Sequence, residues 1–284
     1  MSNYLITKSG VKVYRRWEDN IIVDSHLPAI QWKASQKKDR FTSGKAKGFP
    51  KLASANSEDA LSWNLFRTLE KHELLGALTN HLGLTDTFHV LYWHRPLNQR
   101  DPEAGILPAL DKIEPWGRGG RRQQTETDIM LRGEKYLLMI ESKLGRPGKK
   151  MKAWNRETKG LIPQDYKSYV QPLLVKPGNW EETFQRFYQL LRNMVLGCEL
   201  ARTWSLKPHL IAIVNMLNFN WDGRSHEEEF NEFRKAINVP ESVYLFTWQY
   251  LREEIAAMDK AVLQLLLQYL NKHPCLTKQE TMSL

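Results

Sequence analysis

Two acidic residues and a lysine near the middle of the chain have the types and spacing that suit phosphate chemistry. Side chains alternate along a strand, so Asp128 has a defined face on residues 125–131 if that segment is extended. Glu141 and Lys143 share one face of residues 136–143. If these two segments pair as a hairpin, Asp128 and Glu141 converge at its end away from the turn.

Two carboxylates form a hard oxygen site suited to Mg²⁺, which keeps several waters and completes its shell with substrate phosphate. A bound metal ion lowers the pKa of its water, and the ammonium of Lys143 adds charge stabilisation in the transition state. The alternative is an ion-pair network in which Lys143 neutralises Glu141 or Asp128, although such pairs usually lie on exposed faces. The opposite strand face is apolar and predicts burial: Ile129, Leu131, Leu138 and Ile140.

The elements before this hairpin are predicted from caps and periodicity. Ser57 is a suitable N-cap for a helix, Glu58 and Asp59 suit its positive end, and leucines then repeat on one face. Residues 87–93 are predicted to form a strand. Residues 33–47 are rich in lysine and predict a basic loop or arm, and residues 95–124 predict a long loop.

After the hairpin, residues 144–178 again predict a loop. A helix is expected from Asn179, with Glu182 at capping-box spacing. Gln185, Gln189 and Arg192 share one face of that helix, beside its apolar stripe. Further on we expect a strand at 208–215, an acidic helix at 226–238, a strand at 243–248 and one long amphipathic helix, 251–269, before Pro274.

This order of elements predicts an α/β fold with a mixed central β-sheet flanked by helices. No linker divides the sequence, so we expect a basic N-terminal extension (1–50), one domain (51–272) and a short tail (273–284). Two cysteines exclude a thiolate zinc cage and a disulfide framework, and the chain lacks apolar stretches long enough for a membrane span. Absence of a signal peptide and of disulfides predicts a cytoplasmic protein.

The charge distribution indicates a polyanionic partner. The net charge is +9, and residues 1–50 and 111–160 each carry an excess of six positive charges. Nucleic acid is the expected partner, and a solvated basic surface is the alternative. The basic loops that flank the hairpin supply the candidate phosphate contacts: Arg118, Arg121, Arg122, Arg146, Lys149 and Lys150.

Residues 125–128 (TETD), twelve intervening residues and then residues 141–143 (ESK) resemble the PD-(D/E)xK, or restriction-endonuclease-like, nuclease superfamily. The pattern of that superfamily is an acid on one strand and (D/E)-x-K on the next, between two helices. One departure is Thr127, which stands where many members have proline. The resemblance implies an α-β-β-β-α-β core, here followed by a strand and a long helix.

The resemblance also implies residue roles. Asp128 and Glu141 would bind Mg²⁺, with Mn²⁺ as a substitute, and the backbone carbonyl of Ser142 would be a further ligand. Lys143 would position the attacking water. Glu58 would add an acid from the first helix, with Asp59 as its rival. A glutamine on the later helix would support the site, for which we expect Gln189. Glu126 remains open, either as a further metal ligand or as an ion-pair partner of a neighbouring arginine.

The expected function is metal-dependent hydrolysis of DNA, with RNA as an alternative substrate, by an endonuclease of a restriction, defence or repair type. The alternative is a nuclease-like module that binds nucleic acid or a protein partner without cutting it. A homodimer and a complex with a partner subunit are both compatible with the sequence.

Overall fold

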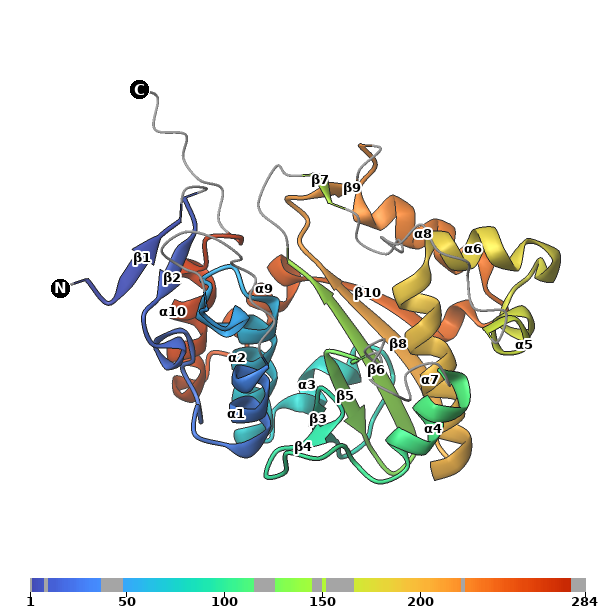
Figure 1. Cartoon of the computed structure of the whole chain (residues 1–284), viewed down its shortest axis with the longest axis horizontal. Coiled ribbons are helices and arrows are strands. Elements are labelled where there is room, and N and C mark those ends of the chain that lie inside the picture. Colours follow the sequence, from blue (N-terminus) through green and yellow to red (C-terminus); the bar gives the residue numbers. More distant parts are fainter. Residues whose placement is uncertain are drawn as a thin grey trace.

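The computed structural model shows a six-stranded mixed sheet between two layers of helices (Figure 1). It describes residues 2–7, 10–36, 48–114, 126–144, 150–151, 166–220 and 223–276, with the backbone alone at 150–151 and 219–220. The strand order is β10-β8-β6-β5-β3-β4. The bounds of these strands are β3 His89–Tyr92, β4 Arg95–Pro96, β5 Ile129–Arg132, β6 Tyr136–Lys143, β8 Lys207–Val214 and β10 Val243–Thr247. The predicted mixed sheet flanked by helices is therefore confirmed.

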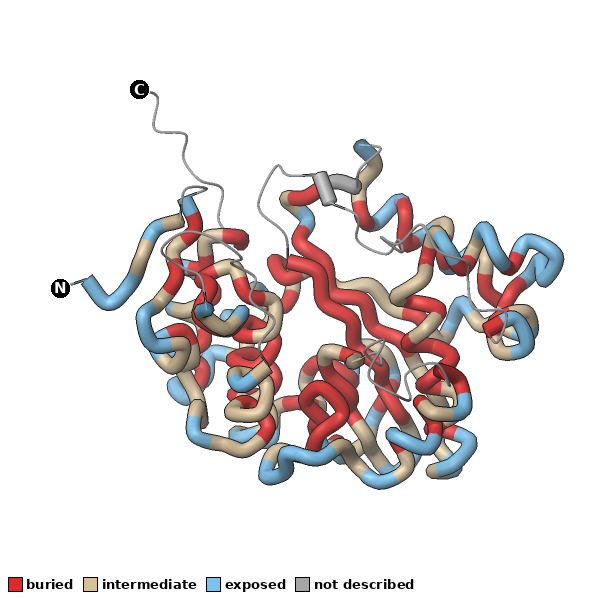
Figure 2. The backbone as a smooth tube through the Cα atoms, in the orientation of Figure 1, coloured by how far each residue is buried: buried red, intermediate tan, exposed pale blue. Residues whose placement is uncertain are grey.

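Strand β6 lies at the centre of the sheet, antiparallel to β5 and parallel to β8. Its side chains alternate between the two helical layers, with Leu138 and Ile140 on one side and Leu137 and Met139 on the other. Figure 2 shows that the central strands are buried along most of their length. A central strand covered on both faces places its three last residues, Glu141 to Lys143, inside the protein.

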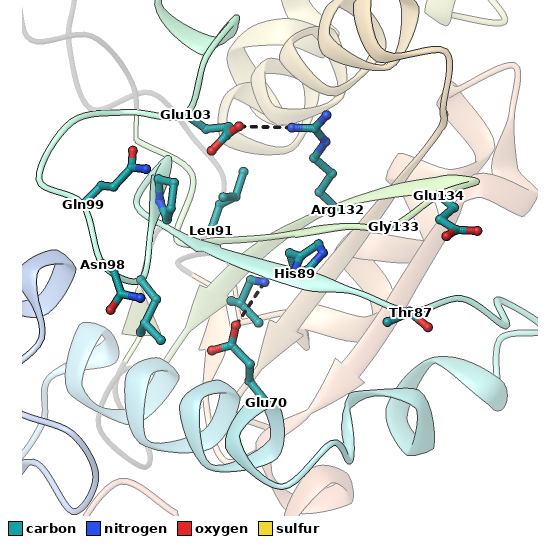
Figure 3. A pocket seen from close by; sticks show the side chains of 13 residues that line it. Glu70, Thr87, His89, Leu91, Asn98, Gln99, Glu103, Arg132, Gly133 and Glu134 are labelled. Atoms are coloured by element: carbon teal, nitrogen blue, oxygen red, sulfur yellow. Dashed lines mark hydrogen bonds and ion pairs between the residues drawn. The ribbon is translucent and has the colours of Figure 1, made fainter.

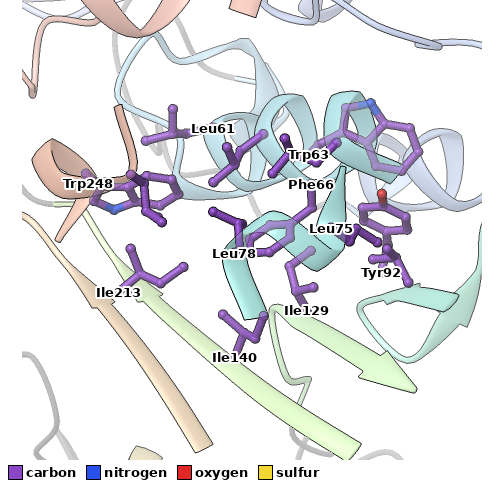
Figure 4. Close-up of a cluster of buried hydrophobic side chains, with 14 of the residues drawn as sticks. Leu61, Trp63, Phe66, Leu75, Leu78, Tyr92, Ile129, Ile140, Ile213 and Trp248 are labelled. Atoms are coloured by element: carbon purple, nitrogen blue, oxygen red, sulfur yellow. The ribbon is translucent and has the colours of Figure 1, made fainter. Parts of the chain in front are cut away.

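One helical layer packs against the even-numbered face of β6. Its core contains Trp63 and Phe66 from α2, Trp248 from α9 and Ile140 from β6 (Figure 4). Burying a large apolar side chain stabilises the fold by about 1.5–3 kcal/mol, so this layer holds the sheet end firmly. Its helices are α1 Pro28–Ser35, α2 Glu58–Lys71, α3 Leu75–Asn80, α9 Trp248–Ala257 and α10 Gln264–Lys272.

The opposite layer is centred on α7, which approaches the sheet closely at Gly197. A Cβ atom at Gly197 would lie 2.8 Å from Cγ of Met139, so only glycine lets the helix backbone lie this near to β6. The helices of this layer are α4 Ile106–Ile113, α5 Lys167–Val170, α6 Trp180–Arg186, α7 Tyr188–Trp204 and α8 His226–Ala236.

The remaining elements are short. Strands β1 Tyr4–Ile6 and β2 Lys12–Tyr14 form one two-stranded sheet, and β7 Lys150–Met151 pairs with β9 Phe219–Asn220 in another. The 3₁₀ helices are η1 Trp17–Asn20, η2 Lys51–Ala53, η5 Gln171–Leu173, η6 Pro177–Asn179, η7 Pro240–Ser242 and η8 Ala261–Leu263. None of the helices in the described part of the chain combines the length and the apolar character that crossing a bilayer requires.

The N-terminal residues pack directly on α2. The amide of Asn20 donates to the carbonyls of Leu52 and Ser54, both at 2.8 Å, and the indole of Trp63 donates to the carbonyl of Val23. The prediction of a basic loop over 33–47 is wrong at its start, because Lys33 lies in α1; residues 37–47 are outside the described residues. The expected boundary at residue 50 stays a prediction.

Four further predictions of secondary structure are wrong in part. The expected loop 95–124 contains β4 and α4, and the expected loop 144–178 contains α5. The helix expected from Asn179 is divided at Phe187 into α6 and α7, and Asn179 forms no side-chain cap. The final helix is likewise two helices, α9 and α10, which are separated where Asp259 takes a positive φ of 44°.

Other predictions of elements are confirmed. The hydroxyl of Ser57 accepts a hydrogen bond from the Ala60 amide and caps α2. The hairpin β5–β6 turns at residues 133–135, and β8, α8 and β10 follow within one or two residues of their expected bounds. The elements that present the acidic residues are thus those that the periodicity predicts.

Candidate functional site

Asp128 and Glu141 oppose each other at the end of the hairpin away from its turn. Asp128 immediately precedes β5, and the antiparallel register that pairs Ile129 with Ile140 continues to place Asp128 opposite Glu141. Glu141 is 4% exposed, while Asp128 is half-buried. The convergence of the two carboxyl groups predicted from strand alternation is therefore seen in the fold.

The carboxyl group of Asp128 is held by the residue that follows Glu141. Its Oδ2 atom accepts hydrogen bonds from the Ser142 amide at 2.9 Å and from the Ser142 hydroxyl at 3.1 Å. Burial and the neighbouring Glu141 raise the pKa of Asp128 to about 8, despite the two donors. Asp128 and Glu141 repel each other when both are ionised, and this repulsion adds to the effect of burial on the pKa of Asp128.

Lys143 and Glu141 form a buried ion pair. The distance from Nζ of Lys143 to Oε1 of Glu141 is 2.5 Å. Burial by itself would lower the pKa of Lys143, but the carboxylates of Glu141, Glu58 and Asp128 raise it above the ordinary lysine value. Lys143 is thus a charged hydrogen-bond donor at neutral pH. The ion pair considered as an alternative exists, but it lies inside the protein rather than on an exposed face.

Asn193 on α7 fixes the second oxygen of Glu141. Its Nδ2 atom donates to Oε2 of Glu141 at 2.8 Å, and its Oδ1 accepts from the hydroxyl of Thr127 at 3.2 Å. All three residues are buried. Sequence reasoning missed Asn193, because an asparagine within an apolar helical stripe is the only signal that could have indicated it.

A strained turn after β3 holds the strand that carries Asp128. Trp93 and His94 have positive φ values of 50° and 72°, and the Trp93 amide donates to the Asp128 carbonyl at 3.2 Å. The Thr127 amide donates to Nε2 of His94 at 3.0 Å, so that ring nitrogen carries no proton. Burial lowers the pKa of His94 to about 3. A proline in place of Thr127 would have no amide proton for this bond.

Glu58 reaches the same end of the hairpin from the N-terminus of α2. Its Oε1 accepts from the Leu144 amide at 2.9 Å, and it interacts electrostatically with Lys143 and Asp128. The Leu144 carbonyl accepts from the side-chain amides of Asn215 and Asn218, at 3.0 and 2.7 Å. The strand end is therefore fixed through both backbone groups of Leu144.

Asp59 and Glu126 belong to a neighbouring ion-pair cluster. Lys33 of α1 lies 3.3 Å from Asp59 and 3.1 Å from Glu126, and its ammonium is 4.8 Å from the centre of the Trp93 ring. The Trp93 indole also donates to Asp59 at 3.0 Å. Glu126 thus pairs with a lysine distant in sequence, whereas Arg121 and Arg122, the partners considered from the sequence, lie outside the described residues.

The predicted glutamine face is only partly assembled. Because the helix is divided at Phe187, Gln185 lies exposed on α6, while Gln189 is half-buried on α7. Among the described residues, the Oε1 atom of Gln189 is buried without a hydrogen-bond partner. The supporting role expected for Gln189 stays a prediction.

The predicted phosphate contacts remain untested. Lys150 lies in β7, where only the backbone is described. The others lie outside the described residues: Arg118, Arg121, Arg122, Arg146 and Lys149.

A cavity of about 560 Å³ lies at the opposite end of the hairpin, next to the sheet edge formed by β3 and β4 (Figure 3). It is lined by His89, Glu103 and Arg132, and the last two form an ion pair of 3.2 Å. Neither Asp128 nor Glu141 lines this cavity, so the cavity is separate from the site.

A comparison with known families gives the chain its classification. The family described as restriction endonuclease associating with ARP (REase-ARP) matches residues 3–273. The chain belongs to the REase-ARP family. No curated protein and no solved structure matches it. Membership of REase-ARP confirms the restriction-endonuclease-like resemblance, and it assigns a nuclease-like domain to nearly the whole chain.

Proposed function

We propose that this REase-ARP protein hydrolyses phosphodiester bonds of DNA with the help of a divalent cation, Mg²⁺ or Mn²⁺. The observation that carries the proposal is the pair of facing acids, the half-buried Asp128 and the buried Glu141, beside the ammonium of Lys143 in a restriction-endonuclease family. RNA is the alternative substrate class.

The donor set fits a hard divalent cation. Asp128, Glu141 and the carbonyl of Ser142 would hold it, and Glu58 lies at the same strand end as a further carboxylate. The repulsion that raises the pKa of Asp128 is the kind that a bound cation relieves. Among the described residues, no group of three or more His, Cys, Asp or Glu is placed to hold a metal ion, so waters and substrate would complete the shell. When bound, the metal ion would supply an activated water and stabilise charge on the phosphoryl oxygens.

The residues of the chain would divide the remaining work. Lys143 keeps its proton, so its ammonium would hold the attacking water by hydrogen bonding and stabilise developing negative charge, rather than act as a base. Asn193 would keep the Glu141 carboxylate in one orientation, and the two donors of Ser142 would do so for Asp128. Holding both carboxylates in one orientation would keep the attacking water and the phosphate in position to react.

A protein partner is part of the proposal. The family description says that its members associate with ARP, and we propose that this chain does so as well. A partner subunit or a second copy of the chain would then act together with the site, and the basic loops that flank the hairpin would contact DNA. Co-purification with ARP, compared with the chain alone on a sizing column, tests this association.

The activity test uses plasmid DNA, linear duplex DNA and single-stranded RNA, each with Mg²⁺, with Mn²⁺ and with EDTA. We expect metal-dependent cleavage by the wild-type chain, and at least a 100-fold loss in D128N, E141Q and K143M. K135M is the matched lysine control, since Lys135 lies in the hairpin turn. Full cleavage by D128N or K143M would refute the assignment.

One observation favours a second candidate, a nuclease-like module that binds without cutting. Glu141 already has Lys143 as a cationic partner at 2.5 Å, so a metal ion must share that carboxylate. Tight DNA or partner binding that does not depend on Mg²⁺, with no cleavage of any substrate, would support this candidate over the nuclease.

A further inference from the structure

We propose that Arg192 of α7 is an anion-binding residue that takes a phosphate oxygen of the nucleic acid. This inference rests on the proposed function and names a substrate contact that neither the family nor the acidic motif assigns. Arg192 immediately precedes Asn193, whose side chain donates to Glu141.

Arg192 is half-buried, and its guanidinium has few partners among the described residues. Its Nε atom is buried with no hydrogen-bond partner, and no carboxylate of the described residues lies within 4.0 Å of its nitrogens. It lies over the ring of Tyr188, whose centre is 5.0 Å from the guanidinium carbon. Other enclosed cations of this region are paired, such as Lys33 and Lys143. A buried guanidinium N–H without a partner in the described part of the chain is costly, so it points to a ligand for the half-buried Arg192.

Arg192 interacts electrostatically with Glu141 but forms no ion pair with it. Burial would lower its pKa, and Tyr188, Tyr166, Glu114 and Glu141 together raise it. Its charge also contributes to the low pKa of His94. Arg192 therefore lies on the α7 side of the hairpin end, within electrostatic reach of Glu141.

Phosphate is the ligand class that best suits this group. Guanidinium donors match the geometry of phosphate oxygens and bind them with strong charge-assisted hydrogen bonds.

The test compares R192Q and R192K with R202Q. Arg202 is an exposed arginine of the same helix that pairs with Glu199. Two readouts need no catalysis: the rise in melting temperature with inorganic phosphate at constant ionic strength, and the affinity for a fluorescent DNA duplex in EDTA. We expect R192Q to lose the phosphate-induced rise and to bind DNA at least 10-fold more weakly, R192K to lie between, and R202Q to match the wild type.

Stability distinguishes binding from a structural role. Without phosphate, R192Q should melt at the same temperature as the wild type or higher, because it removes a half-buried charge that has no carboxylate partner among the described residues. A lower melting temperature together with an unchanged phosphate response would overturn the proposal. The two proposals can fail separately. If phosphate binding depends on Arg192 but the wild type cleaves no substrate, only the nuclease proposal is refuted. If R192Q cleaves DNA as well as the wild type does, only the role of Arg192 is refuted.

Discussion

Thr127 joins the two acid-bearing strands to the helix behind them. Its amide bonds to His94 and its hydroxyl to Asn193, which in turn bonds to Glu141. The residue that departs from the superfamily pattern is therefore part of the network that orients the acids. A buried polar network of this kind stabilises the fold when every member has its hydrogen-bond partners. Removing one member is costly because it leaves the others buried without partners.

Asn193→Ala should damage both stability and activity. The change leaves Oε2 of Glu141 and the hydroxyl of Thr127 without their partner, which costs about 1–3 kcal/mol for each unsatisfied buried group. We expect a lower free energy of unfolding in urea and at least a 10-fold loss of cleavage. T127V removes only the hydroxyl and should have the smaller effect. Equal stability and cleavage for N193A and wild type would show that the bond to Glu141 does not matter.

Buried histidines should make the protein sensitive to acid. Burial lowers the pKa of His94 to about 3 and those of His226 and His273 to about 4, whereas an unfolded histidine titrates near 6.5. Between the folded and the unfolded pKa values, the unfolded state therefore binds more protons. The histidine contribution to the free energy of unfolding is fully present above pH 6.5 and falls as the pH decreases towards 3–4. Each histidine contributes up to about 1.4 kcal/mol per pH unit in this window. Urea unfolding of wild type and H94Q at pH 7, 6 and 5 checks this, and equal slopes against pH would contradict it.

At the scale of elements, the hairpin is held by a residue from outside it. The carboxylate of Asp86 accepts from the amides of Glu134, Lys135 and Tyr136, at 3.1, 2.8 and 3.2 Å. These three bonds fix the turn and therefore the register that sets Asp128 against Glu141. Burial would raise the pKa of Asp86, but the backbone donors lower it.

Asp86→Ala should loosen the hairpin. Because Asp86 is only half-buried, solvent screens its interactions, and we expect the free energy of unfolding to fall by only about 1 kcal/mol. The folded pKa is below the unfolded one, so this contribution is present above pH 4 and vanishes as the pH falls further. Hydrogen exchange of the Lys135 and Tyr136 amides should accelerate in the variant. Unchanged protection of both amides would show that Asp86 does not hold the turn.

Local patterns predicted the elements that carry the acids, but not those whose ends depend on tertiary contacts. Period-two alternation located β5 and β6, and Ser57 located the start of α2. The division at Phe187 could not be predicted, because the apolar stripe continues across it from Phe184 to Leu191. Val262 and Leu265 fit a helical stripe, yet they are 48% and 57% exposed after the chain turns at Asp259.

At the scale of the whole molecule, the N-terminal segment contributes to the site. Lys33 lies on α1, yet its ammonium joins Asp59 of α2 to Glu126, next to the start of β5. A sequence pattern cannot reveal a pair 93 residues apart, and for the same reason Asn193 went unnoticed. The basic character of residues 1–50 therefore includes a lysine that serves the interior and is unavailable for DNA.

Lys33→Met should destabilise the folded chain. It leaves Asp59 and Glu126 as enclosed carboxylates without their cation, for which a loss of about 3 kcal/mol is typical. Lys51→Met is the matched control, because Lys51 is an exposed lysine near the same helix. Thermal unfolding in EDTA measures both variants. A melting temperature of K33M equal to that of K51M would show that the cluster does not stabilise the fold.

The central claim is that Asp128 and Glu141 share one divalent cation. Anomalous diffraction from crystals grown with Mn²⁺ tests it most directly, because manganese scatters anomalously and binds carboxylate oxygens in the same manner as Mg²⁺. We expect one strong peak about 2.0–2.4 Å from an oxygen of each carboxylate, and its loss in D128N. A well-ordered site with no peak at saturating Mn²⁺, or a peak bound to neither residue, would contradict the claim.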